Sequence, residues 1–157
     1  MINEVNMCLV AWLKSQTEKS ALVQQLNCFH TQGSGIARRI REEWPIVYDV
    51  DVQNSKFGDK TKLGTFTWAE VIPNKFAFGL YSQFNFGGKS RCTSYDALAD
   101  GLIVLNQHLQ DNEIFTLGLP KRIGSALGGG SWPIVEAIIT DVFQHSPIDV
   151  YICDYQP

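Results

Sequence analysis

The stretch that decides the fold spans residues 119–139 and reads LPKRIGSALGGGSWPIVEAII. Its apolar start predicts the end of a strand, and its last part predicts a helix with Pro133 in the first turn. Four glycines lie between the two, within residues 124–130. Backbone N–H groups in such a glycine loop can cradle a phosphate or diphosphate, and the helix N-terminus adds further donors. No Gly-Lys-Ser/Thr follows, so the stretch is not the P-loop of a nucleotide triphosphatase.

A second glycine loop precedes a helix earlier in the chain, at residues 27–37 (NCFHTQGSGIA). Gly33 and Gly35 let the backbone approach a ligand closely, or they only allow a tight turn. His30 is either a general acid or base, with an ordinary pKa of about 6.5, or a residue that merely hydrogen-bonds the loop. Cys28 is either a nucleophile or an inert buried thiol.

The rest of the chain alternates between strand and helix patterns. Helical spacing predicts helices at residues 35–44, 94–110 and 133–145, the last with Ile134, Val135, Ile138 and Val142 packed. Strands are predicted at residues 5–13, 21–27, 64–72, 76–83, 114–119 and 148–153, and a polar surface loop at 54–62. This order predicts an α/β fold with a mixed central sheet and helices on both faces, a three-layer α/β/α arrangement. Both glycine loops follow strands, at the edge where such sheets bind ligands.

Composition narrows the classes of protein. The 157 residues and 17.6 kDa indicate one domain, residues 1–157. A net charge of −3 and a pI near 5.5 give no basic footprint for duplex nucleic acid. No apolar run is long enough to span a membrane, and the start of the chain lacks a basic signal-peptide region. The four cysteines form no C-x-x-C pair, so we expect free thiols in a reducing cytoplasm, with no metal and no cofactor.

Aromatic residues follow the 76–83 strand. Phe84 and Phe86 can wall a nucleobase or ribose pocket, and so can Tyr81, although sheet packing is the simpler role for Tyr81. The two remaining histidines, His108 and His145, fall on predicted helices and are expected to face solvent.

Four segments together resemble those of macro domains: QQLNCFHTQGSGIARRI, KLGTFTWAEV, LYSQFNFGGKSRCTSYDAL and LPKRIGSALGGGSWPIVEAII. The resemblance covers roughly residues 20–153 and is greatest to the bacterial and phage-type relatives of ADP-ribose 1″-phosphate phosphatase. It implies the macro domain fold, with a site for ADP-ribose across the crest of the sheet.

The resemblance also implies roles for individual residues. Asn27 is expected to orient the distal ribose or the attacking water, and His30 to perform the acid–base step. The residues expected to bind the ligand are Cys28; Gly33, Ser34, Gly35 and Ile36 of the first loop; Tyr81, Gln83 and Phe84; and Ser125, Ala126, Leu127, Gly128, Gly129 and Gly130 of the second loop.

The chain departs from the family pattern at three places. The Gly-Asp pair that commonly follows the first strand and binds the adenine amino group is matched to residues 10–13, which contain no acid. Trp12 there either stacks on a base or belongs to the core. Ser131 replaces an aspartate before the tryptophan of the second loop. The lysine and aspartate of relatives that remove ADP-ribose from nucleobases are matched by Cys92 and Gly128.

These observations predict an enzyme that hydrolyses ADP-ribose 1″-phosphate to ADP-ribose and phosphate. Two alternatives stay open: a binding module for ADP-ribose or an NAD-derived nucleotide, and an ADP-ribosyl hydrolase acting on protein carboxyl esters. The expected partner is a small nucleotide ligand, free or attached to an ADP-ribosylated macromolecule, and neither duplex nucleic acid nor a membrane.

Overall fold

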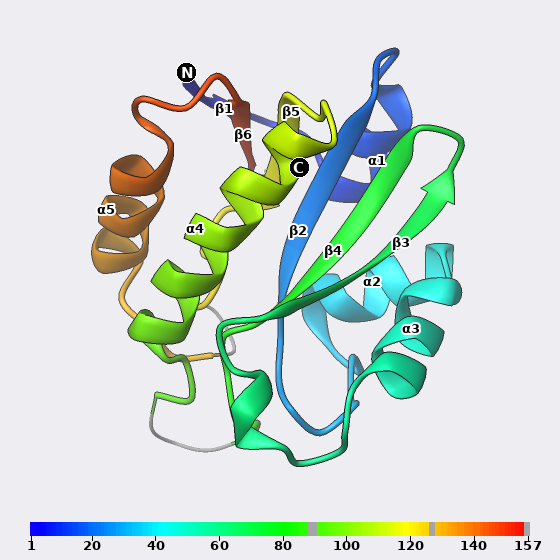
Figure 1. Ribbon diagram of the computed structural model, residues 1–157, viewed down its shortest axis with the longest axis vertical. Coiled ribbons are helices and arrows are strands. Elements are labelled where there is room, and N and C mark those ends of the chain that lie inside the picture. The colour runs from blue at the N-terminus through cyan, green and yellow to red at the C-terminus, as the bar shows by residue number, and fades with distance from the viewer. Residues whose placement is uncertain (88–90, 126–127, 156–157) are drawn as a thin grey trace.

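A single mixed sheet organises the computed structural model, which describes residues 1–87, 91–125 and 128–155. Within these residues the sheet has six strands in the order β1-β6-β5-β2-β4-β3 (Figure 1). Only β3, at one edge, runs antiparallel to its neighbour. The strands are β1 (Ile2–Val5), β2 (Ser20–Leu26), β3 (Phe66–Ile72), β4 (Lys75–Tyr81), β5 (Thr116–Pro120) and β6 (Asp149–Cys153). The helices are α1 (Leu9–Ser15), α2 (Gly35–Glu43), α3 (Ile46–Asn54), α4 (Tyr95–Asp111) and α5 (Trp132–Phe143), with a short 3₁₀ turn η1 (Lys60–Lys62).

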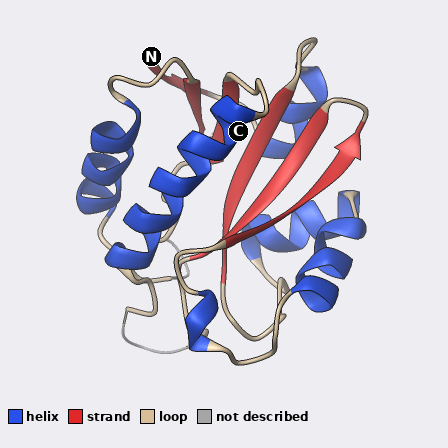
Figure 2. Ribbon diagram, in the orientation of Figure 1, coloured by secondary structure: helices blue, strands red, loops and turns tan. Residues whose placement is uncertain are grey.

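Helices cover both faces of the sheet (Figure 2). Helices α4 and α5 pack on one face, where Val23 of β2 joins their core. Helices α1, α2 and α3 pack on the other face, where Leu22 of the same strand is buried. The predicted three-layer α/β/α fold with a mixed sheet is therefore confirmed.

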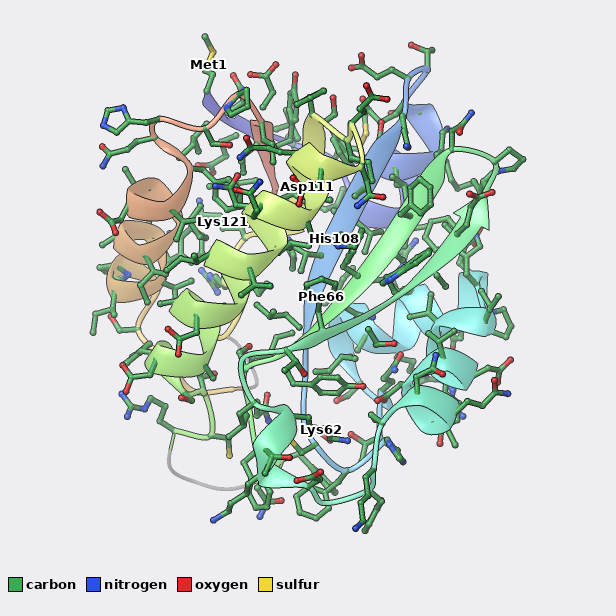
Figure 3. The ribbon with its side chains drawn as sticks, viewed as in Figure 1. Met1, Lys62, Phe66, His108, Asp111 and Lys121 are labelled. Atoms are coloured by element: carbon green, nitrogen blue, oxygen red, sulfur yellow. The ribbon has the colours of Figure 1, made fainter. Side chains whose placement is uncertain are left out.

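The periodicity of α4 was predicted well. Its apolar face is completely buried, through Leu98, Leu102, Leu105 and Leu109. Ser94 caps the helix, because its Oγ accepts a hydrogen bond of 3.1 Å from the backbone N–H of Ala97. His108 does not simply face solvent, because its ring lies 5.1 Å from that of Phe66, beside it in Figure 3.

Two expectations about local structure were wrong, and helix α3 was not predicted. Residues 5–13 are not one strand, because β1 ends at Val5 and α1 then buries Leu9, Val10, Trp12 and Leu13. Helix α3 begins directly after Pro45, whose missing N–H is no loss at the start of a helix. Ile134 of α5 is 46% exposed, since its neighbour Val135 takes the inward position.

Trp12 belongs to the core, so the alternative that it stacks on a bound base is wrong. Its side chain is 3% exposed, and its ring lies 5.5 Å from that of Tyr151. It presses on β5 at Gly118, where an added Cβ would come within 2.4 Å of the indole. No helix in the described part of the chain is long and apolar enough to cross a membrane.

Replacing Gly118 by alanine tests this close approach. The rigid indole of Trp12 cannot rotate away from the new methyl group, so we expect Gly118→Ala to lower the free energy of unfolding by about 1–3 kcal/mol. Urea denaturation followed by tryptophan fluorescence measures the change. Gly33→Ala is the control, because the nearest atom to its Cβ would be the Thr31 carbonyl oxygen at 3.8 Å. Equal stability of the two variants would contradict the proposed contact.

Candidate functional site

A pocket of about 700 Å³ opens at the carboxyl edge of the sheet. As predicted, the two glycine loops follow the parallel strands β2 and β5, and both line this pocket. Of the residues expected to bind or act on the ligand, the lining includes Asn27, Gly33, Ser34, Gly35, Ile36, Gln83 and Gly128. It does not include Cys28, His30, Tyr81, Phe84, Ser125, Gly129 or Gly130. Ala126 and Leu127 lie outside the described residues.

The first loop is wound tightly before α2. His30, Gln32 and Gly35 adopt left-handed backbone angles, with φ of 54°, 42° and 60°. Asn27 holds the turn, because its Oδ1 accepts from the Phe29 N–H at 2.8 Å and its Nδ2 donates to Thr31 Oγ1 at 2.5 Å. The loop therefore delivers the start of α2 to the pocket in one conformation.

The start of α2 is suited to an anion. Ser34 occupies the N-cap position, and its side chain makes no capping hydrogen bond. Gly35, Ile36 and Ala37 of the first helical turn line the pocket. The N–H groups of a first helical turn have no partner within the helix, so they can bind a phosphate group.

The second loop is shaped by side chains of neighbouring strands and loops. Gln25 Nε2 donates to Gln83 Oε1 at 2.8 Å and to Thr93 Oγ1 at 3.1 Å. Thr93 Oγ1 in turn donates to the Gly124 carbonyl at 2.5 Å. The backbone N–H of Thr93 donates to the Gly128 carbonyl at 3.1 Å. A Cβ at Gly128 would stand 2.2 Å from Thr93 Oγ1, so this packing requires a glycine there.

A buried carboxylate, Asp51 of α3, forms part of the pocket wall. Its side chain is 1% exposed. It accepts hydrogen bonds from the Tyr81 hydroxyl, from Gln32 Nε2 at 3.0 Å and from Ser55 Oγ at 3.1 Å. Gln32 lines the pocket too, and its buried Oε1 has no hydrogen-bond partner among the described residues. Asp51 thereby ties the first loop to β4 and α3.

His30 and Lys62 complete this polar group, which we call the Asp51 network (Asp51, Gln32, Tyr81, Ser55, His30 and Lys62). His30 Nε2 lies 2.9 Å from Ser55 Oγ and 3.9 Å from Asp51 Oδ1. Lys62 Nζ donates to Ser55 Oγ at 3.0 Å and supplies a positive charge close to the carboxylate. His30 therefore faces the Asp51 network and not the pocket, although it belongs to the first loop.

Cys28 is enclosed beneath the first loop. Its side chain packs with Leu26 and Tyr81 in a small apolar cluster. Burial raises the pKa of the Cys28 thiol, and the nearby Lys62 only partly opposes this effect. A neutral, enclosed thiol is a poor nucleophile, so the geometry favours the inert role.

Sequence reasoning missed Asp51 and Lys62. Lys62 falls at the end of the 54–62 segment that was predicted to be a surface loop, but it is 8% exposed. The available signal for Asp51 was its spacing of four residues from Val47, which puts a carboxylate on the buried face of α3.

No protein-family model matches the chain. In sequence it is 33% identical over 134 residues to an uncharacterised 17.5 kDa protein from the tk-vs intergenic region of Enterobacteria phage T4, covering 83% of each chain. It is 27% identical over 147 residues to the DNA ADP-ribosyl glycohydrolase of Mycobacterium tuberculosis, covering 92% of this chain and 40% of that protein.

Solved structures share the fold. A protein of unknown function from Bacteroides thetaiotaomicron matches with a TM-score of 0.87 at 20% identity, over 98% of each chain. The macrodomain of Thermus aquaticus DarG matches with a TM-score of 0.77 at 19% identity, over 100% of this chain and 99% of that one. Thermosipho africanus DarTG, solved in complex with ADP-ribose, matches with a TM-score of 0.67 at 18% identity, over 87% of this chain and 38% of that one.

Removing the Tyr81 hydroxyl tests the Asp51 network. Tyr81→Phe leaves the buried Asp51 with one donor fewer, so we expect the free energy of unfolding at pH 7 to fall by about 1–3 kcal/mol. Burial, followed by the bond to Asp51, raises the pKa of Tyr81 above its usual 10. Tyr81 thus stabilises the fold below pH 10, and this contribution is lost as the pH rises further.

The Tyr81→Phe variant should therefore also show a shallower fall of stability above pH 10 than the unchanged protein. Denaturation midpoints measured between neutral and alkaline pH test both effects. Tyr155→Phe is the matched control, because the Tyr155 side chain is exposed. Identical pH profiles for the two variants would show that the hydroxyl of Tyr81 is not held by Asp51.

Proposed function

We propose that the chain, which has the fold of solved macrodomains, binds ADP-ribose in this pocket and hydrolyses ADP-ribose 1″-phosphate to ADP-ribose and phosphate. The observation that carries the proposal is the meeting of both glycine loops on one pocket at the carboxyl edge of the sheet. Its volume of about 700 Å³ suits a nucleotide-sized ligand. The Thermosipho neighbour, which has the same fold, was solved with ADP-ribose.

Backbone amides are the proposed diphosphate ligands. The first turn of α2 lines the pocket, and so do Gly124 and Gly128 of the second loop. The pocket also contains Lys121, but its ammonium already pairs with Glu4 at 2.7 Å and with Asp154 at 3.4 Å. Fixed N–H dipoles therefore do most of the anion binding, and they need no reorganisation when the charge shifts during the reaction.

The observed strand boundaries bear on the expected adenine contact. Residues 10–13, matched above to the acidic pair of the family, lie in α1 and not after the first strand. The residue that follows β1 is Asn6. Asn6 is not among the described residues that line the pocket, so no adenine contact is assigned to it.

The reacting end of the ligand is proposed to lie beside Asn27, Gln32 and Asp51, which all line the pocket. The unpartnered Gln32 Oε1 is an acceptor for a ribose hydroxyl. Asp51 replaces His30 as our candidate base for the attacking water, because Asp51 reaches the wall and His30 does not. His30 becomes a positioning residue that acts on Asp51 through Ser55. Asp51 would take a proton from the water as its oxygen attacks phosphorus and the bond to the 1″ oxygen breaks, and that proton would then pass to the 1″ oxygen of ADP-ribose.

The named activity of the mycobacterial relatives is less well supported in this chain. Cys92 and Gly128, the positions matched to the lysine and aspartate of nucleobase-directed relatives, lie side by side, with the Cys92 N–H donating to the Gly128 carbonyl at 2.8 Å. Neither residue supplies an ammonium or a carboxylate. A binding module remains the second candidate, since Asp51 already accepts three hydrogen bonds within the protein.

Binding is tested first, by titration calorimetry with ADP-ribose, AMP and ribose 5-phosphate. We expect ADP-ribose to bind at least tenfold more tightly than either fragment, because it alone spans both glycine loops. Gly128→Ala should weaken this binding at least tenfold, since its methyl group displaces the second loop from Thr93. Gly101→Ala is the matched control, because the new methyl group on α4 would crowd the side chain of Leu80 on β4, and neither residue lines the pocket. Absence of heat with all three ligands would overturn the proposed binding.

Turnover is tested by measuring phosphate released from ADP-ribose 1″-phosphate. General acid–base groups typically contribute about 10²–10⁴ in rate, so we expect Asp51→Asn to lower kcat by that range while ADP-ribose still binds. His30→Ala should lower kcat less and shift its pH profile, as a residue acting through Asp51 would. If the unchanged protein binds ADP-ribose tightly but releases phosphate no faster than the uncatalysed reaction, the result would favour the binding module.

A further inference from the structure

An apolar groove runs along the outer surface of α4 and α5, on the face of the sheet away from Asp51. Its volume is about 460 Å³. Ile103 and Ile134 form its walls and are 56% and 46% exposed. Its remaining lining is Ala99, Pro133, Ala137, Ile138, Asp141 and Val142. Large exposed aliphatic side chains that share one groove are typical of a surface that binds another protein.

The two helices start at the same end of the groove. Both follow strands whose carboxyl ends share one edge, and the Tyr95 hydroxyl accepts a hydrogen bond of 2.8 Å from the Ser131 N–H (Figure 1). On α4, Asp96 lies near this end and shares a helix face with Ile103, whereas Asp100 lies on the other flank, beside Gly64 just before β3. On α5, Asp141 lies at the far end, beyond Ile134. The apolar centre of the groove thus has carboxylates at both ends.

Neither α4 nor α5 contains a lysine or an arginine. The sequence contains no lysine or arginine from residue 92 to 120 or from 123 to 157. Residues 92–157 carry eight carboxylates and two cations, a net charge of −6, whereas residues 1–91 carry +3. The nearest cation before α4, Arg91, stacks on the Tyr95 ring with its Cζ 4.3 Å from the ring centroid. Apart from Arg91 just before α4, the two helices that form the groove therefore present carboxylates and no cation of their own.

We propose that this groove binds an amphipathic helix of a partner protein, with an apolar face flanked by lysine or arginine at both ends. Helix-in-groove binding uses apolar anchors at i, i+3, i+4 and i+7, and complementary charge at the rim sets orientation and the association rate. A partner helix of about 12–14 residues would be about 18–21 Å long, comparable to α5. The inference does not depend on the proposed function, because none of the groove residues lines the ligand pocket.

A second copy of this chain is a poor occupant. Two grooves facing one another would bring Asp96 and Asp141 of one copy towards the carboxylates of the other. The arginine-bearing helix α2 is amphipathic, but its apolar face is used within the molecule, where Ile40 is completely buried. The partner helix therefore belongs to a different protein.

Fluorescence anisotropy with labelled 14-residue peptides tests the proposal. One peptide has leucines at the four anchor positions and lysines at both ends, and the second replaces each lysine by glutamate. We expect the lysine peptide to bind at least tenfold more tightly than the glutamate peptide, and to weaken as salt screens the charges. The double variant Ile103→Ser/Ile134→Ser should lose at least tenfold in affinity for the lysine peptide.

A charge-swap variant provides the sharper measurement. Asp141→Lys keeps the apolar walls and reverses the charge at the far end of the groove, so it should remove the preference for the lysine peptide. Asp100→Lys, on the flank beside Gly64, is the matched control and should leave the preference unchanged. Unchanged ADP-ribose binding and unfolding midpoints in each variant confirm that it folds. Equal binding of the two peptides to the unchanged protein, or no binding of either, would overturn the proposal. So would sedimentation showing a dimer that the serine variants dissociate, since the groove would then be an interface between copies.

Discussion

The constraint on which the rest of the molecule depends is the place of β2, parallel to β4 on one side and to β5 on the other. Because all three strands end at the same edge, the first glycine loop, the end of β4 and the second glycine loop meet there. Leu22 and Val23 are buried on opposite faces of β2. A slip of one residue would exchange these faces, so packing fixes the register that assembles the pocket.

Two buried polar clusters turn that meeting point into a shaped site. Gln25, Gln83 and Thr93 hold the carbonyl groups of the second loop, and the Asp51 network holds the first. In each cluster a side chain from one element satisfies the backbone or side chain of another. Buried polar groups are costly unless they are paired, so each cluster favours one loop conformation over its alternatives.

The sequence predicted what depends on local pattern. Leu98, Leu102, Leu105 and Leu109 revealed α4 because four apolar residues repeat at helical spacing. Residues 5–13 were predicted to be one strand, because a short apolar run has the same pattern in a strand and in a buried helix. Asp51 escaped notice because its role depends on the Tyr81 hydroxyl, 30 residues away in the chain. No local pattern reveals that a carboxylate will meet such a donor.

Charge divides the molecule in a way that agrees with both proposed surfaces. Residues 92–157 contain only two cations, Lys121 and Arg122, and both line the pocket. They stand at the loop after β5, where a diphosphate would add negative charge, and Lys121 is held there by Glu4 and Asp154. Helices α4 and α5 contain no lysine or arginine, so no cation within these helices neutralises their carboxylates. Residues 92–157 thus have their two cations beside the pocket, with Lys121 already paired, and helices α4 and α5 keep carboxylates that suit a basic partner.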